Sequence, residues 1–254
     1  MPIGVSAPPR TRPPLVTVVV ALVLVAVFAG TLLLRRAPPA LFCTDLTESA
    51  QALRASADTL QGFTCRWGAV PDQLHRGQDL LTLVTSVFVH VGWVHLLVNV
   101  AFLAAFAPRV EDDLGHAGVL AVFLGCATVA GAVHVLLAPN QTDPSIGASG
   151  GVAGVLGAHL LLAPRAQVRV LVAVVPVRLP TWFVIGMWAA LQLVYTVVAL
   201  RRAQDLGAVS YDVHAVGFVA GLVVVLLALW WRPGLRRWRP EPQRGPADAL
   251  PAPR

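Results

Sequence analysis

The sequence has little charge and few cysteines, and it contains no lysine. Charged residues make up 13% of the 254 residues, whereas 56% are hydrophobic and the mean hydropathy is +0.71. This balance excludes an ordinary soluble domain and predicts one helical membrane bundle. All 19 basic residues are Arg, which we attribute to a GC-rich coding sequence. The formal charge of +6 does not indicate nucleic-acid binding, because the arginines cluster in the C-terminal tail, where topology rules and anionic lipid favour them.

The chain has only three cysteines, and no pair of them has the spacing of a zinc site. Cys126 falls in an apolar run, so we expect a small core residue. Cys43 and Cys65 lie in one polar loop and can form a disulfide if that loop faces an oxidising compartment. The sequence leaves this pairing open.

Apolar runs predict six membrane helices, at 15–34, 91–107, 117–137, 149–162, 181–200 and 213–231. About 20 residues are needed to cross a hydrocarbon core of roughly 30 Å. The fourth helix is too short to do so at about 1.5 Å per residue. We therefore expect an all-α integral membrane protein, with a six-transmembrane-helix bundle over 15–231 and a short central helix four.

The segments outside these helices are polar. We expect 1–14 and the Arg- and Pro-rich 232–254 to be disordered, and 35–89 to form a long first loop. Arginines in the tail and between helices four and five place both termini in the cytoplasm and the first loop outside it, in a multi-pass protein of the cell membrane. Four arginines argue against this orientation: Arg35, Arg36, Arg201 and Arg202.

A serine between glycines opens the short fourth helix, in Gly147-Ala148-Ser149-Gly150. Glycines let a substrate backbone come close. If the helix begins partway through the bilayer, the preceding backbone must line a wet cavity enclosed by protein. Free N–H groups at the helix start could hold an oxyanion. The pattern favours a nucleophile; the alternative is that Ser149 only packs against its neighbours.

His214 is the natural base for Ser149. Small residues recur at four-residue spacing on both helices, at Gly150 and Gly154 and at Gly217 and Gly221. Packing these faces together would bring His214 to Ser149. Asp212 is two positions from His214 and points off its face, so a Ser–His dyad is favoured over a triad.

Other histidines fall in the apolar runs. His95 and Asn99 are four residues apart and share one helix face, where they could complete an oxyanion hole or act as hydrogen-bonding glue between helices. We interpret His134 and His159 as structural. A transporter with a polar path through the membrane would show paired charges or a repeated half, and neither is present.

The ordered set of motifs over about residues 80–231 resembles the rhomboid intramembrane serine proteases. It rests on His90 with His95-xxx-Asn99, on Gly147-Ala148-Ser149-Gly150 and on His214-xx-Gly217-xxx-Gly221. The resemblance implies that Ser149 is the nucleophile, that His214 is the general base, and that His95, Asn99 and the Ser149 N–H bind the oxyanion. It implies no metal or cofactor.

The resemblance also implies a lateral gate near helix five that admits the transmembrane helix of a single-span membrane protein as substrate. The alternative is a non-catalytic rhomboid-like protein that binds transmembrane helices; inactive members tend to lack the Ser or the His, and this chain has both. The position four after the nucleophile, often an aromatic residue stacked on the catalytic His, is Ala153. The sequence therefore leaves the orientation of His214 open.

Overall fold

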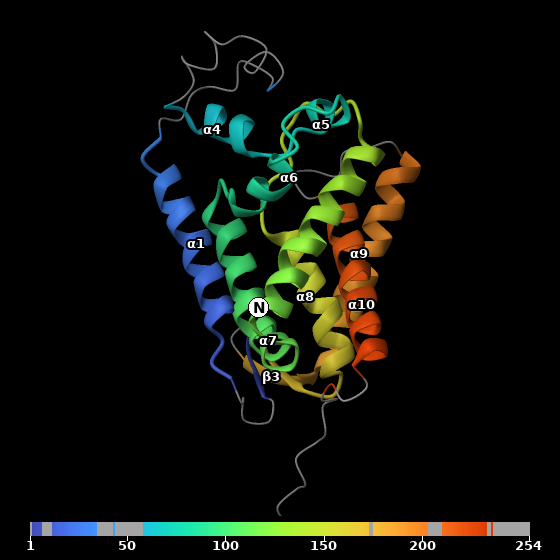
Figure 1. Ribbon diagram of the computed structural model, residues 1–254. Coiled ribbons are helices and arrows are strands. Elements are labelled where there is room, and N and C mark those ends of the chain that lie inside the picture. Colours follow the sequence, from blue (N-terminus) through green and yellow to red (C-terminus); the bar gives the residue numbers. More distant parts are fainter. Residues whose placement is uncertain are drawn as a thin grey trace, which may run out of the picture.

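The computed structural model describes residues 2–6, 12–34, 43, 58–172, 175–202, 210–232 and 235. Apolar helices stand side by side in it; short helices and loops close one end of the molecule and a small sheet closes the other (Figure 1). Most of the predicted tail over 232–254, and of the first-loop segment 35–57, lies outside the described residues.

Three described helices are long and apolar enough to cross a membrane. They are α7 (Trp93–Leu137), α10 (Tyr211–Trp231) and the first 19 residues, Thr181–Ala199, of α9 (Thr181–Arg202). The helices α1 (Leu15–Thr31) and α8 (Ser149–Leu162) are apolar but shorter. This confirms the predominantly helical membrane protein that the sequence predicts.

The predicted second and third helices form one 45-residue element, α7, which is bent at Gly115. Gly115 has φ 81°, in the left-handed region that favours glycine. The two arms, 93–114 and 116–137, run in opposite directions (Figure 1). We name them the first arm and the second arm of α7.

The acidic link expected between helices two and three is helical, so that boundary was wrong. Arg109 donates two hydrogen bonds to the Asp113 carboxylate, at 2.8 and 2.9 Å, one helical turn away. This pair supports the last turn of the first arm. The charged residues that suggested a loop therefore stabilise a continuation of the helix.

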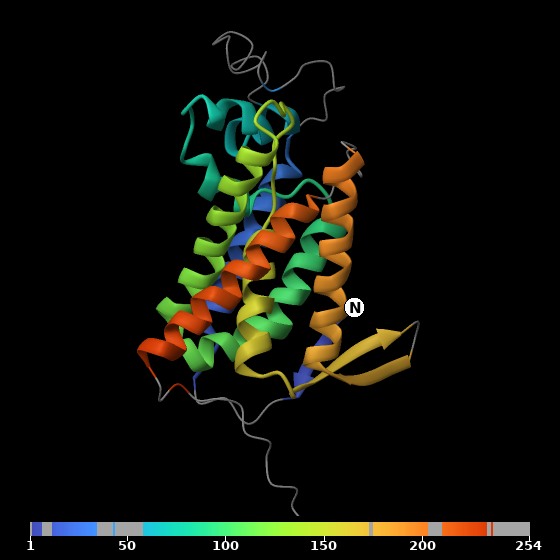
Figure 2. The same cartoon turned by 90° about the vertical axis from the view of Figure 1, so that its right-hand side faces the viewer.

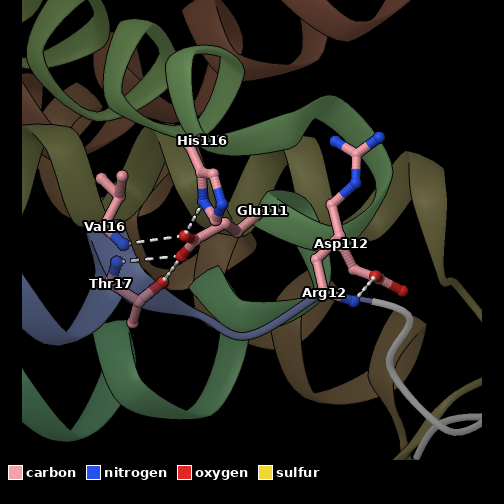
Figure 3. A network of polar contacts seen from close by, with 6 residues as sticks. All are labelled: Arg12, Val16, Thr17, Glu111, Asp112 and His116. Carbon is pink, nitrogen blue, oxygen red and sulfur yellow. Dashed lines mark hydrogen bonds and ion pairs between the residues drawn. The ribbon is translucent and has the colours of Figure 1, made fainter.

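Glu111 is fully buried at the bend and holds the start of α1 (Figure 3). Its carboxylate accepts hydrogen bonds from the backbone N–H groups of Val16 and Thr17, at 2.8 and 2.9 Å, and from the Thr17 hydroxyl at 2.6 Å. His116 Nδ1–H donates to the same carboxylate at 2.6 Å. An N-terminus of a helix leaves such N–H groups without partners, so Glu111 acts as a cap supplied by another helix.

A three-stranded antiparallel sheet was not predicted. Its order is β1 (Pro2–Ser6), β2 (Gln167–Val172) and β3 (Val175–Pro180). Strand β1 lies within the stretch expected to be disordered, and β2 and β3 form a hairpin in the stretch expected to be a loop. The alternating valines of β2 and β3 suit a strand, and β1 pairs along the free edge of β2.

At the opposite end lie α4 (Leu60–Trp67), α5 (Pro71–His75), α6 (Thr82–Thr85) and the 3₁₀ turn η1 (Ser86–Phe88) (Figure 1). Cys43 and Cys65 form a disulfide there, which answers the question that the sequence left open. Cys126 is buried and free, as expected. Ala69 and Ser145 form a backbone bridge, which ties this layer to the loop before α8.

Helix α8 forms the centre of the bundle, with the bounds that the sequence predicts. Every residue over 150–159 is buried. A helix that is apolar and buried on all sides belongs in a core rather than at a lipid surface. Its N-terminus, with Ser149, points toward the end that carries the disulfide (Figure 2).

Candidate active site

Ser149 is the first residue of α8, and the loop before it is held by backbone contacts. Gly147 N–H donates to Ser86 O at 2.9 Å, and Ala148 N–H donates to His90 Nε2 at 3.4 Å. Ala148, the N-cap residue, makes no side-chain cap, so the first amides of α8 are not satisfied in that way.

Gly147 has no room for a side chain. Its φ is +111°, which L side chains rarely adopt, and a Cβ at this position would lie 2.5 Å from His95 Nε2. The imidazole of His95 therefore packs directly on the backbone before Ser149. His95 thus lies beside the loop that leads into α8.

The glycine faces of α8 and α10 pack against each other. A Cβ at Gly217 would collide with the carbonyl oxygen of Gly150, and a Cβ at Gly221 would collide with that of Gly154. Only glycine allows such an approach of two helix backbones. The predicted packing of these two faces is confirmed.

This packing puts His214 next to the start of α8. A Cβ at Gly150 would lie 3.0 Å from Val213 Cγ1, and Gly150 also touches Gly217. His214 lies between those two α10 positions, and Ser149 directly precedes Gly150. No hydrogen bond joins Ser149 to His214, both of which lie within the described residues.

His214 is instead bound by residues of α9 and α10. Its Nδ1–H donates to Gln192 Oε1 at 2.8 Å. The ring centroids of Trp188 and Tyr211 lie 6.0 and 6.4 Å from that of His214. Sequence reasoning missed Gln192, although a lone amide in an apolar run was a signal of the kind that drew attention to Asn99.

Asn99 is buried on the same face as His95, as the four-residue spacing predicts. Its Nδ2 donates to the backbone O of His95 at 2.9 Å. This bond lies within one helix, so it is not the interhelical glue that was the alternative. One amide N–H of Asn99 is used in this way, and the amide has a second to donate.

His90 has a role that its place at a loop end did not suggest. Burial, and to a lesser extent the charge of His95, lowers the pKa of His90 to about 4. The neutral ring can then accept from Ala148 N–H through Nε2, while Nδ1 faces Phe88 O at 3.4 Å. His90 is thus a buried support for the loop that carries Ser149.

His134 has a partner that the sequence did not reveal. Its Nδ1–H donates to Asp212 Oδ2 at 2.6 Å and joins the second arm of α7 to the first turn of α10. Asp212 therefore points away from His214, as expected from their spacing. His159 Nδ1–H donates to Phe106 O at 3.0 Å in the core, which fits its structural interpretation.

Known proteins of one family are similar to this chain. A family model described as the rhomboid domain matches residues 77–231. The putative rhomboid protease YdcA of Bacillus subtilis is 32% identical over 80 residues, which cover 32% of this chain and 40% of that protein. Rhomboid protein 1, mitochondrial, of Saccharomyces cerevisiae is 28% identical over 148 residues, which cover 56% and 40%.

A third relative, rhomboid-like protein 11, chloroplastic, of Arabidopsis thaliana, is 30% identical over 146 residues, or 57% of this chain and 51% of that protein. The chain thus spans about half or less of the length of these relatives. The domain match covers well over half of the 254 residues and includes α7, α8, α9 and α10. The chain therefore belongs to the rhomboid family.

Proposed function

We propose that this chain is an intramembrane serine endopeptidase that crosses the membrane six times and cleaves transmembrane segments of single-span proteins. The observation that carries the proposal is the contact between α8 and α10. Glycines at both helices bring the turn of α10 with His214 against the N-terminus of α8 with Ser149. A half-buried serine, a histidine and helix-start amides without a side-chain cap are parts that acyl transfer needs.

In the proposed reaction, Ser149 Oγ attacks the scissile carbonyl carbon and His214 Nε2 takes the hydroxyl proton. The C–N bond then breaks, and the same proton passes to the leaving amine. Water attacks the resulting acyl-enzyme, again losing a proton to His214, which returns it to Ser149. In the structure the two side chains are not hydrogen-bonded; such bonds are often long before substrate binds.

The oxyanion would be held by three donors. The backbone N–H of Ser149 lies at the helix start, His95 packs on Gly147 two residues earlier, and Asn99 has an amide N–H beyond the one given to His95. Donors held in place before the reaction stabilise the charge that develops in the transition state. The Asn99 side chain would turn from His95 O toward the substrate or donate through its second hydrogen.

The proposed orientation in the cell membrane rests on the two ends of the bundle. The Cys43–Cys65 disulfide lies at one end, and disulfides persist in oxidising compartments. Arg169 and Arg178 face each other in the register of the hairpin at the other end. We place the hairpin and both termini in the cytoplasm, since basic residues favour that side.

The test is labelling of the detergent-solubilised protein with a fluorophosphonate probe. Wild type should be labelled, and Ser149→Ala and His214→Ala should each abolish labelling. Ser145→Ala and His75→Ala are matched controls, because these residues lie at the same end of the bundle and outside the proposed dyad. Both controls should be labelled like wild type.

Two results would count against a protease. One is a folded, monodisperse wild type that takes no label, which would favour a rhomboid-like protein that binds transmembrane helices without cutting them. The other is labelling that survives in both Ser149→Ala and His214→Ala, which would place the reactive group elsewhere.

A further inference from the structure

We propose that Gln192 is the positioning residue of His214, and that it selects the ring tautomer that can activate Ser149. This inference rests on the proposed dyad. It assigns to α9 a part in the reaction beyond the binding of substrate. It is supported by one hydrogen bond to His214, two ring contacts of α9 and the binding of Asp212 to His134.

The hydrogen bond decides which ring nitrogen carries the proton. The amide oxygen Oε1 of Gln192 can only accept, so the bond of 2.8 Å requires a proton on His214 Nδ1. In the neutral ring Nε2 is then the unprotonated nitrogen. A general base in a serine hydrolase needs this tautomer, because the partner of one ring nitrogen sets what the other can do.

Helix α9 also supplies an aromatic contact to the same ring. Trp188 is four residues before Gln192 and therefore on the same helix face. Its ring is tilted by 34° to that of His214, with the centroids 6.0 Å apart. Tyr195, one further turn along, stacks on Tyr211 at 4.8 Å. The methyl side chain of Ala153 on α8 cannot stack on His214. Helix α9 supplies the aromatic contact instead, through Trp188.

The nearest carboxylate does not bind His214. Asp212 accepts from His134 at 2.6 Å and is held against the second arm of α7. Besides Asp212, the ionisable side chain whose charge affects His214 is His95 of α7. A neutral amide thus takes the position that a carboxylate occupies in a catalytic triad, and it orients the ring without adding charge.

Gln192 connects two helices that otherwise meet through apolar and aromatic side chains. Within the described part of α9, the other side-chain hydrogen bonds run from Thr181 to Ala166 O and from Thr196 to Gln192 O. Helix α9 lies at the outside of the bundle, and its large side chains Met187, Leu191 and Leu193 are exposed. The orientation of His214 therefore depends on the position of an outer helix of the bundle.

The test compares three variants at two neighbouring positions. Gln192→Met keeps the size but removes the acceptor, and Gln192→Glu keeps an acceptor and adds charge. Leu193→Met is the matched control, because it introduces the same residue one position along, on the exposed side of α9. All are prepared as the full chain in detergent, and their thermal unfolding is recorded first.

The first measurement does not depend on activity. Nitrogen-15 NMR of histidine-labelled protein distinguishes the two tautomers, and the His214 signals are those missing from His214→Asn. We expect a single Nδ1–H tautomer in wild type and in Leu193→Met, and a mixture of both tautomers in Gln192→Met. An unchanged Nδ1–H tautomer in Gln192→Met would overturn the proposal.

The second measurement is the pH profile of kcat with a transmembrane substrate. Gln192→Met should lower kcat roughly tenfold, the effect of one orienting hydrogen bond, with KM unchanged. Gln192→Glu should restore kcat and move the acid limb to higher pH, since a carboxylate stabilises the imidazolium. Wild-type kcat in a folded Gln192→Met would also overturn the proposal.

The two proposals fail in different ways. If wild type neither cleaves substrate nor takes the fluorophosphonate probe, the proposed function is wrong, and the NMR measurement still decides whether Gln192 orients His214. If Gln192→Met proves unstable, Gln192→Glu decides: an unmoved acid limb in that variant counts against the proposal.

Discussion

Gly221 of α10 lies so close to Gly154 of α8 that a Cβ at position 221 would overlap the carbonyl oxygen of Gly154. The obstacle is backbone, which cannot move aside as the end of a flexible side chain can. The same relationship holds one turn earlier, between Gly217 and Gly150. These contacts set the distance between the helices that carry the proposed nucleophile and base.

Gly221→Ala should therefore destabilise the protein by roughly 1–3 kcal/mol, the usual effect of an added methyl group in a packed core. Activity should fall with stability, because α10 is pushed from α8. The measurements are thermal unfolding in detergent and fluorophosphonate labelling. Gly186→Ala on α9 is the control, since nothing lies within 4 Å of a Cβ there. An unchanged Tm in Gly221→Ala would contradict the packing.

Asn99→Ala should lower kcat roughly 10²-fold if Asn99 donates to the oxyanion, a loss typical of one such donor. KM should change little, since the bond forms in the transition state. Cleavage of a transmembrane substrate measures this. Loss of the bond to His95 O alone would appear as lower stability at wild-type kcat, and that result would leave Asn99 a structural role only.

The bond between His134 and Asp212 should contribute to stability as a unit. Asp212→Asn and His134→Leu should each cost roughly 1–3 kcal/mol, because each leaves a polar partner unpaired at a largely buried site. The double variant should cost less than the sum of the two. Thermal unfolding of wild type, the two single variants and the double variant gives a double-mutant cycle. Strict additivity would mean that the bond contributes nothing.

The proposed orientation predicts which cysteines react from outside the cell. His75→Cys in α5 should label with an impermeant maleimide on intact cells, whereas Arg178→Cys in β3 should label only after permeabilisation. Wild type is the control, because Cys126 is buried and the other two cysteines are bonded to each other. The reverse labelling pattern would mean that the protein has the opposite orientation in the membrane.

Much of the bundle could be predicted because it depends on local composition. The run 149–162 has the bounds of α8, and the glycine spacings at Gly150 and Gly217 predicted which faces meet. The predictions that were wrong concern segments whose structure depends on contacts with residues far away in the sequence. Glu111, in the acidic stretch after 107, caps α1 from 95 residues away, and β1 pairs with the edge of a hairpin more than 160 residues further along the chain.

The site divides in the same way. The sequence by itself determined the apolar helices, the small-residue faces and the candidate groups Ser149, His95 and His214, because these follow from residue type and periodicity. Only the tertiary structure decided that His214 binds Gln192, 22 residues away, and that Asp212 binds His134, 78 residues away. Which polar groups meet depends on the rotation and depth of each helix, and the packing of the whole bundle sets both.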